Sequence, residues 1–188
     1  MINAAKETRA TSTLADLGVM RVLWIGLLLL GSLVLQTTVL EQVTFLGVTP
    51  QLGLVVVVSL AYIEGERVGV VTGFTAGLVQ DLLLPVGSIV GLTALVYTLI
   101  GFAVGSLSRY SVSESVWAPI LGVILASAAA EASYAAMSIM LGENWVSVAY
   151  TGKVIGLVVL YNTLLTPFVY PFVRKVANRF GPGRVYTS

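Results

Sequence analysis

Two carboxylic acids stand inside apolar runs of this 188-residue chain, and these are the residues that could support chemistry. Asp81 ends the run GVVTGFTAGLVQD, and Glu131 lies within ASAAAEAS. An acid in such a run must be protonated, paired or in contact with water, so the two could form a proton relay or a cation site. The structural alternative is that Asp81 reaches a surface or caps the backbone turn after it, while Glu131 hydrogen-bonds to Ser127 or to hydroxyls of neighbouring helices. We favour the structural alternative for Asp81 and leave both open for Glu131.

The sequence contains neither histidine nor cysteine, so two of the side chains that enzymes use most often for catalysis are absent. Intramembrane proteases use a serine–histidine pair, a histidine-rich zinc motif or paired aspartates. A single aspartate in an apolar run provides none of these. We therefore expect no enzymatic activity, no cofactor and no metal centre. The net charge of +1 gives no reason to expect a nucleic-acid partner.

Glycines recur at intervals of four residues in the same part of the chain, where they would leave helix faces without side chains. Residues four apart share a face of a helix, and small residues there let a second backbone approach closely in a membrane. We expect such faces to pack either an internal neighbour or the membrane helix of a partner. With Asp81 at the rim, the candidate packing or interface positions are Gly69, Gly73, Gly77, Gly87, Gly91, Gly101 and Gly105.

The composition indicates an integral membrane protein. Hydrophobic residues make up 57% of the chain and charged residues only 10%, whereas about a quarter of an ordinary soluble domain is charged. A crossing helix needs about 20 apolar residues. Six runs qualify, of which the second and third are the shortest and are joined by EGER. The predicted spans are Leu23–Leu40, Leu46–Ile63, Val68–Leu84, Ile89–Leu107, Val116–Leu141 and Val154–Val173.

The basic residues predict the orientation of this six-helix, all-α bundle. With both termini in the cytoplasm, every lysine and arginine except Lys153 falls on the cytoplasmic side, in agreement with the positive-inside rule. The expected organisation is a cytoplasmic N-terminal segment (residues 1–22), a six-helix transmembrane domain (23–173) and a cytoplasmic C-terminal tail (174–188). The first apolar run is interpreted as a retained helix, because no small-residue cleavage site follows it.

The segment Thr49–Leu107 resembles the rod shape-determining protein MreD family. That family has a proline before an apolar span, a short charged turn, a G-x-x-x-G-F-x-x-G-L-x-x-D-L run, a glycine-containing turn, and then GLTAL followed by LIGF. Here the run extends from Gly69 to Leu82 and includes Asp81. The matching proline is Pro50, and the final motifs fall on Gly91–Leu95 and Gly101–Gly105.

This resemblance implies a non-catalytic scaffold in the bacterial inner membrane, within the machinery for cell elongation and peptidoglycan synthesis. The partner it implies is a bitopic, MreC-like membrane protein. Indirect partners would be the MreB filament, the glycosyltransferase RodA and a penicillin-binding transpeptidase.

A second hypothesis comes from the similarity of the MreD fold to the substrate-binding S components of energy-coupling-factor vitamin transporters. These are six-helix membrane proteins with an outward-facing ligand pocket. In that case Glu131, Asn144, Trp145 and Asn162 would be candidate ligand contacts. Such a pocket needs several convergent polar groups. Because polar residues are sparse here, we favour the scaffold.

Overall fold

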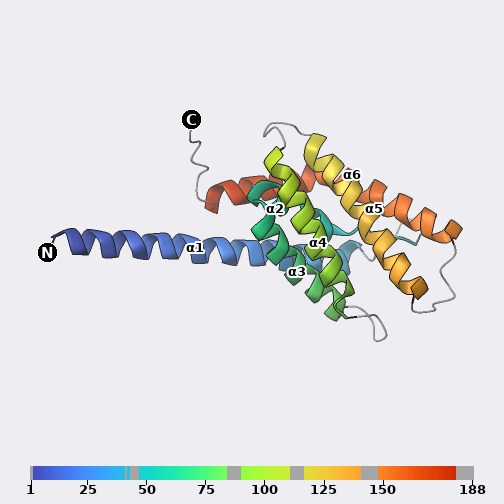
Figure 1. The fold of residues 1–188 in the computed structure, drawn as a ribbon, viewed down its shortest axis with the longest axis horizontal. Coiled ribbons are helices and arrows are strands. Elements are labelled where there is room, and N and C mark those ends of the chain that lie inside the picture. Colours follow the sequence, from blue (N-terminus) through green and yellow to red (C-terminus); the bar gives the residue numbers. More distant parts are fainter. Residues whose placement is uncertain are drawn as a thin grey trace.

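The chain folds into helices packed side by side, as seen in a computed structural model that describes residues 2–40, 42, 47–83, 90–110, 117–140 and 148–180. Gly87, Asn144 and Trp145 lie outside these ranges. The described part is all-helical (Figure 1). Its elements are α1 (Ile2–Leu35) with a π-helical continuation (Gln36–Leu40), α2 (Leu52–Glu64), α3 (Glu66–Leu83), α4 (Leu92–Leu107) with a 3-10 turn (Ser108–Tyr110), α5 (Trp117–Met140) and α6 (Val148–Phe180).

The six helices overlap the six predicted spans, but their ends differ. Helix α1 is continuous from Ile2, so the polar residues before Leu23 extend the helix instead of forming a separate irregular segment. Helix α2 begins at Leu52, later than the predicted Leu46, because Pro50 lacks an amide hydrogen and disfavours helical backbone in the residue before it. Helix α6 contains Pro167 and Pro171 and continues past the predicted end at Val173 to Phe180.

Three of the described helices are long and apolar enough to cross a membrane. The stretches that qualify are Gly18–Leu40, Trp117–Met137 and Thr151–Arg179, whereas α2 and α4 are shorter apolar helices. Length explains the difference, because a helix rises about 1.5 Å per residue and the hydrocarbon core is about 30 Å thick.

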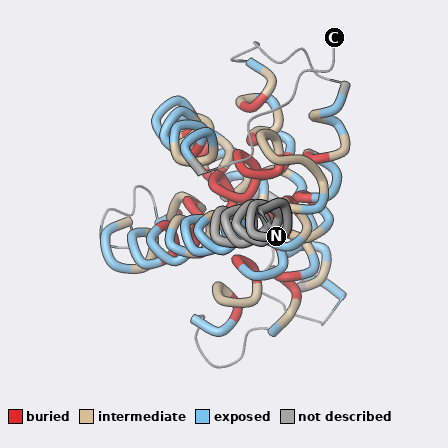
Figure 2. The backbone as a smooth tube through the Cα atoms, turned by 90° about the vertical axis from the view of Figure 1, so that its left-hand side faces the viewer, coloured by how far each residue is buried: buried red, intermediate tan, exposed pale blue. Residues whose placement is uncertain are grey.

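Helix α2 is the centre of the bundle. Every residue from Leu52 to Ala61 is buried, and α2 contacts each of the other five helices. Figure 2 shows the buried residues gathered in the interior, with exposed residues on the outer faces of the surrounding helices. A helix that is apolar on all sides lies either in a protein core or in lipid. The packing of the other helices places α2 in the core.

Helices α3 and α4 form the most extensive helix pair, and their backbones touch. A Cβ atom built on Gly73 would lie 2.7 Å from the carbonyl carbon of Tyr97, and one built on Gly77 would lie 2.5 Å from the Cα of Ala94. Gly69 and Gly101 oppose each other in the same way. Because no real side chain fits at such distances, these glycines are what allows the two helices to pack this closely.

Ion pairs join the helices at the end of the bundle that contains Gly65, where the chain turns from α2 into α3 with a positive φ of 90°. Arg21 of α1 pairs with Glu64 of α2. Arg109 pairs with Glu66 of α3, which also accepts a hydrogen bond of 3.1 Å from Ser106. The two pairs connect α1 to α2 and α3 to α4 at this end.

The contact between α3 and α4 predicts that even a methyl group at Gly73 destabilises the protein. Overpacking a close contact costs about 1–3 kcal/mol, which exceeds the gain of about 1 kcal/mol in helix propensity from glycine to alanine. Gly73→Ala should therefore lower the midpoint of thermal unfolding in detergent by several degrees, as measured by circular dichroism.

The matched control is Gly26→Ala in α1, because a Cβ at Gly26 meets no atom within 4 Å. This variant should be neutral or slightly stabilised. Equal midpoints for the two variants would show that the backbone contact does not limit stability.

Candidate functional site

Asp81 caps helix α4 from the end of helix α3. The carboxylate oxygen Oδ2 of Asp81 accepts hydrogen bonds from the backbone N–H of Gly91 (2.8 Å) and of Ala94 (3.2 Å). The first N–H groups of a helix have no partner within the helix, and a carboxylate also complements the positive end of the helix dipole. Asp81 is 2% exposed. The described structure thus places Asp81 on the backbone at the start of α4.

Gly91 lies directly before α4 with a left-handed φ of 100°, so it forms the turn into that helix. Gly105 faces the backbone of α3 at Glu66, where an added Cβ would lie 2.5 Å from the Cα of that residue. Of the predicted glycine positions, Gly69, Gly73, Gly77, Gly101 and Gly105 all lie in the contact between α3 and α4.

The N-terminus of α2 is capped by two amide side chains, one from the π-helical segment after α1 and one from α6. Asn162 of α6 accepts a hydrogen bond of 2.9 Å from the backbone N–H of Gln51, and Gln36 accepts one of 3.0 Å from the backbone N–H of Gly53. Asn162 is fully buried and donates through Nδ2 to the Ser127 hydroxyl of α5 at 2.9 Å. One amide therefore connects α2, α5 and α6.

Glu131 contacts the same region, but through the side chain of Gln51. The amide nitrogen Nε2 of Gln51 donates to Oε1 of Glu131. The predicted partner Ser127 is instead bonded to Asn162. On the neighbouring helices, the Tyr97 hydroxyl of α4 donates to the Gln80 side chain of α3 at 3.2 Å.

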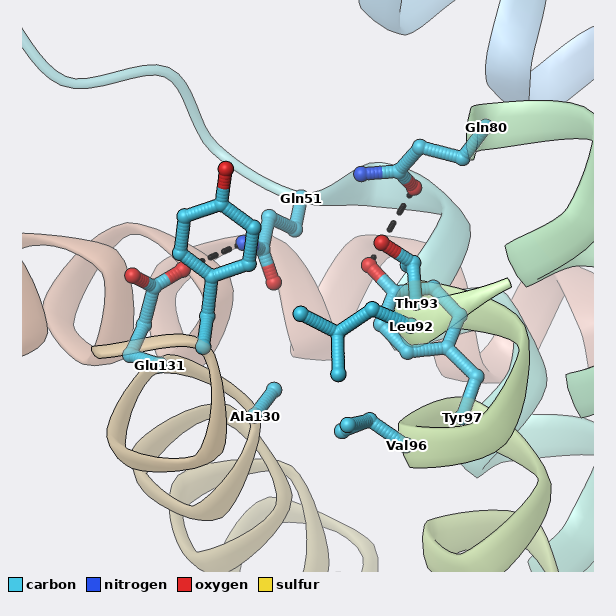
Figure 3. A pocket seen from close by; sticks show the side chains of 9 residues that line it. Gln51, Gln80, Leu92, Thr93, Val96, Tyr97, Ala130 and Glu131 are labelled. Carbon is cyan, nitrogen blue, oxygen red and sulfur yellow. Dashed lines mark hydrogen bonds between the residues drawn. The ribbon is translucent and has the colours of Figure 1, made fainter. Parts of the chain in front are cut away.

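These two hydrogen-bonded pairs lie on opposite walls of a cavity of about 190 Å³ (Figure 3). Gln51 and Glu131 form one wall, and Gln80 and Tyr97 form the other. Apolar side chains and two hydroxyl-bearing ones complete the lining. The remaining lining residues are Leu92, Thr93, Val96, Ala130 and Tyr134.

Gln51 lies directly before α2, whose 13 residues span only about 20 Å, and its side chain lines the cavity. The sequence contained a weak signal for this site, namely isolated amides at Gln36, Gln51 and Gln80 within or beside apolar runs. Their convergence depends on packing between distant segments, so no local sequence pattern predicts it.

The chemical groups at this site can bind a ligand through hydrogen bonds. Within the part of the chain that the structure describes, no group of three or more histidine, cysteine, aspartate or glutamate side chains could hold a metal ion. The site offers one carboxylic acid, two amides, a threonine hydroxyl and phenol groups beside an apolar wall. Groups of these types donate and accept hydrogen bonds.

The position of Asp81 predicts different outcomes for two substitutions. Asp81→Asn keeps an oxygen that can accept from the N–H groups of Gly91 and Ala94, so the free energy of unfolding should fall by only about 1 kcal/mol. Asp81→Leu leaves both groups unsatisfied, at a cost of about 1–3 kcal/mol each. Unfolding by sodium dodecyl sulfate in mixed micelles measures both variants, and equal losses would indicate that the charge of Asp81 has a role beyond capping.

Comparison with known proteins identifies the family. The family model described as "rod shape-determining protein MreD" matches residues 18–176, which includes α2 to α5, part of α1, most of α6 and the whole polar site. No curated protein and no solved structure matches the chain. The match covers most of the chain and extends well beyond the segment that carried the resemblance in the sequence. The chain therefore belongs to the MreD family of rod shape-determining proteins.

Proposed function

We propose that this chain, which its family identifies as a membrane protein of the cell-shape machinery, acts as a non-catalytic scaffold for peptidoglycan synthesis during cell elongation. Its direct partner in this proposal is an MreC-like bitopic protein, with MreB, RodA and a penicillin-binding transpeptidase as indirect partners. The family match over residues 18–176 is the observation that carries the proposal.

The proposed topology has six spans in the bacterial inner membrane, with residues 1–22 and 174–188 on the cytoplasmic side. The positive-inside pattern supports this orientation, since only Lys153 falls on the other side. Arg21 and Arg109 both pair with glutamates near Gly65, as expected if that end of the bundle faces the cytoplasm. The polar cavity would then lie toward the outer surface.

The surface that we propose for the partner helix lies on α6. The glycine faces of α3 and α4 are already filled by each other, so they offer no space to a partner. Gly152 and Gly156 have the same four-residue spacing and are exposed, and a Cβ added to either would meet no atom within 4 Å. Exposed Leu160 continues this face by one more turn. A bitopic partner contributes a single membrane helix, and a glycine face lets such a helix approach closely.

The vitamin-binding alternative has less support. Pockets for drug-sized ligands occupy about 300–1,000 Å³, whereas the cavity here measures about 190 Å³. Asn144 and Trp145, two of its candidate contacts, lie outside the described residues. Glu131 lines the cavity, and Asn162 is committed to capping α2.

The partner surface can be tested by co-expressing the chain with a tagged MreC-like protein and purifying the tagged protein in mild detergent. The wild-type chain should co-purify. Gly156→Leu should reduce the recovered fraction about tenfold or more, because loss of a close helix contact worth about 1.4 kcal/mol changes an equilibrium constant tenfold.

The control variant is Gly26→Leu, which adds the same side chain to an open position on α1. It should leave recovery unchanged. Full recovery with Gly156→Leu would exclude the α6 surface, and failure of the wild-type chain to co-purify would contradict the scaffold proposal.

A further inference from the structure

The polar cavity contains a hydrogen-bond acceptor that the fold leaves unused. Oxygen Oε1 of Gln51 is buried and has no hydrogen-bond partner among the described residues. The orientation of this amide follows from its neighbour, because its nitrogen Nε2 donates to the Glu131 carboxylate. The oxygen must therefore point the other way, into the cavity (Figure 3). A buried acceptor without a donor costs about 1–3 kcal/mol, so a ligand that donates to it would be stabilised.

Glu131 also differs from the other carboxylates whose side chains the structure describes. Glu64 and Glu66 each pair with an arginine. Asp81 accepts from two backbone N–H groups through Oδ2, and although its Oδ1 is buried without a partner, Asp81 does not line the cavity. Glu131 receives a hydrogen bond only from Gln51 among the interactions of the described residues, and only at Oε1. Its second oxygen thus remains available on the same wall as the free oxygen of Gln51.

The opposite wall supplies a third acceptor. The hydroxyl hydrogen of Tyr97 goes to Gln80, which leaves the lone pairs of the Tyr97 oxygen available. Leu92, Val96 and Ala130 line the cavity with apolar surface. The site therefore combines three oxygen acceptors, one of them a carboxylate, with room for a short hydrocarbon.

We propose that this cavity binds a primary ammonium group carried on a short apolar body, with Gln51 and Glu131 as its principal contacts. A primary ammonium has three N–H donors and one positive charge, so it matches the acceptors and the unpaired carboxylate together. A volume of about 190 Å³ admits a group of several heavy atoms and excludes a vitamin-sized molecule. The ammonium can come from a free small amine or from the ethanolamine head group of a lipid.

A metal ion fits this site less well. Ca²⁺ takes six to eight oxygen ligands and Mg²⁺ requires near-octahedral geometry, usually with several waters. The cavity has a single carboxylate and an apolar side.

The first experiment measures thermal unfolding of the full-length protein in an amine-free detergent and buffer. The probe is n-butylammonium chloride, with n-butanol and tetramethylammonium chloride as controls that lack the charge and the N–H donors, respectively. Butylammonium should raise the midpoint by several degrees in a saturable manner, and neither control should do so. A rise of equal size with tetramethylammonium would contradict the proposal, because it would show a general effect of organic cations.

Two matched variants locate the effect. Glu131→Gln removes the charge with little change of shape and should abolish the shift caused by butylammonium. Glu66→Gln makes the same substitution at the other end of the bundle and should retain it. A shift that persists in Glu131→Gln would overturn the assignment of the site.

A second measurement uses the wild-type protein and so does not depend on the stability of a variant. A diazoacetamide esterifies accessible carboxyl groups without coupling them to amines, and mass spectrometry reports the esterified fraction at Glu131. Butylammonium should protect Glu131 several-fold and leave the modification of Glu64 and Glu66 unchanged. Equal protection at all three residues, or none at Glu131, would contradict the proposal.

Lipid nanodiscs distinguish the two sources of the ammonium. Phosphatidylethanolamine carries N–H donors on its head group, whereas phosphatidylcholine does not. If the lipid is the ligand, phosphatidylethanolamine alone should protect Glu131 from esterification by the diazoacetamide. If a free amine is the ligand, protection should require added butylammonium in both lipids. Absence of protection under all of these conditions would exclude the site.

Discussion

The N-terminus of helix α2 imposes the main physical constraint on this fold. Helix α2 is apolar on all sides and only 13 residues long, so it lies in the centre of the bundle and its first N–H groups are removed from water. Those groups need acceptors from other helices, and Gln36 and Asn162 supply them from the π-helical end of α1 and from α6. The first and last helices are thereby hydrogen-bonded to the N-terminus of α2. Asn162 also donates a hydrogen bond to Ser127, which connects α5 to the same group of residues.

The contact between α3 and α4 supplies acceptors for the first N–H groups of a second short helix, α4. The glycines of α3 bring the two backbones together in a defined register, with Gly77 against Ala94. Asp81 lies one turn beyond Gly77, so this register delivers its carboxylate to the N–H groups of Gly91 and Ala94. Close packing and capping are therefore two consequences of one helix pairing.

Most of the polar side chains at this end of the bundle are occupied with holding short helices in place. This agrees with a family whose role is rod-shape determination, and whose members work within a larger assembly. Oxygen Oε1 of Gln51, like Oδ1 of Asp81, is buried without a hydrogen-bond partner among the described residues. Gln51 differs from Asp81 in that it lines the polar cavity, together with Glu131.

The sequence by itself determined the membrane character, the approximate position of the six helices and the glycine spacing on α3. These features depend on local composition and periodicity, which a single segment carries. The sequence also identified Asp81 and Glu131 as unusual, since an acid in an apolar run stands out without any structure. It predicted the boundaries less well at α1 and α2, where the helix continues through polar residues or begins only after Pro50.

Only the tertiary structure decided which groups meet. Asn162 contacts Gln51 across 111 positions of sequence, and Gln51 contacts Glu131 across 80. Such pairings depend on how distant helices pack around α2, and no local pattern records that arrangement.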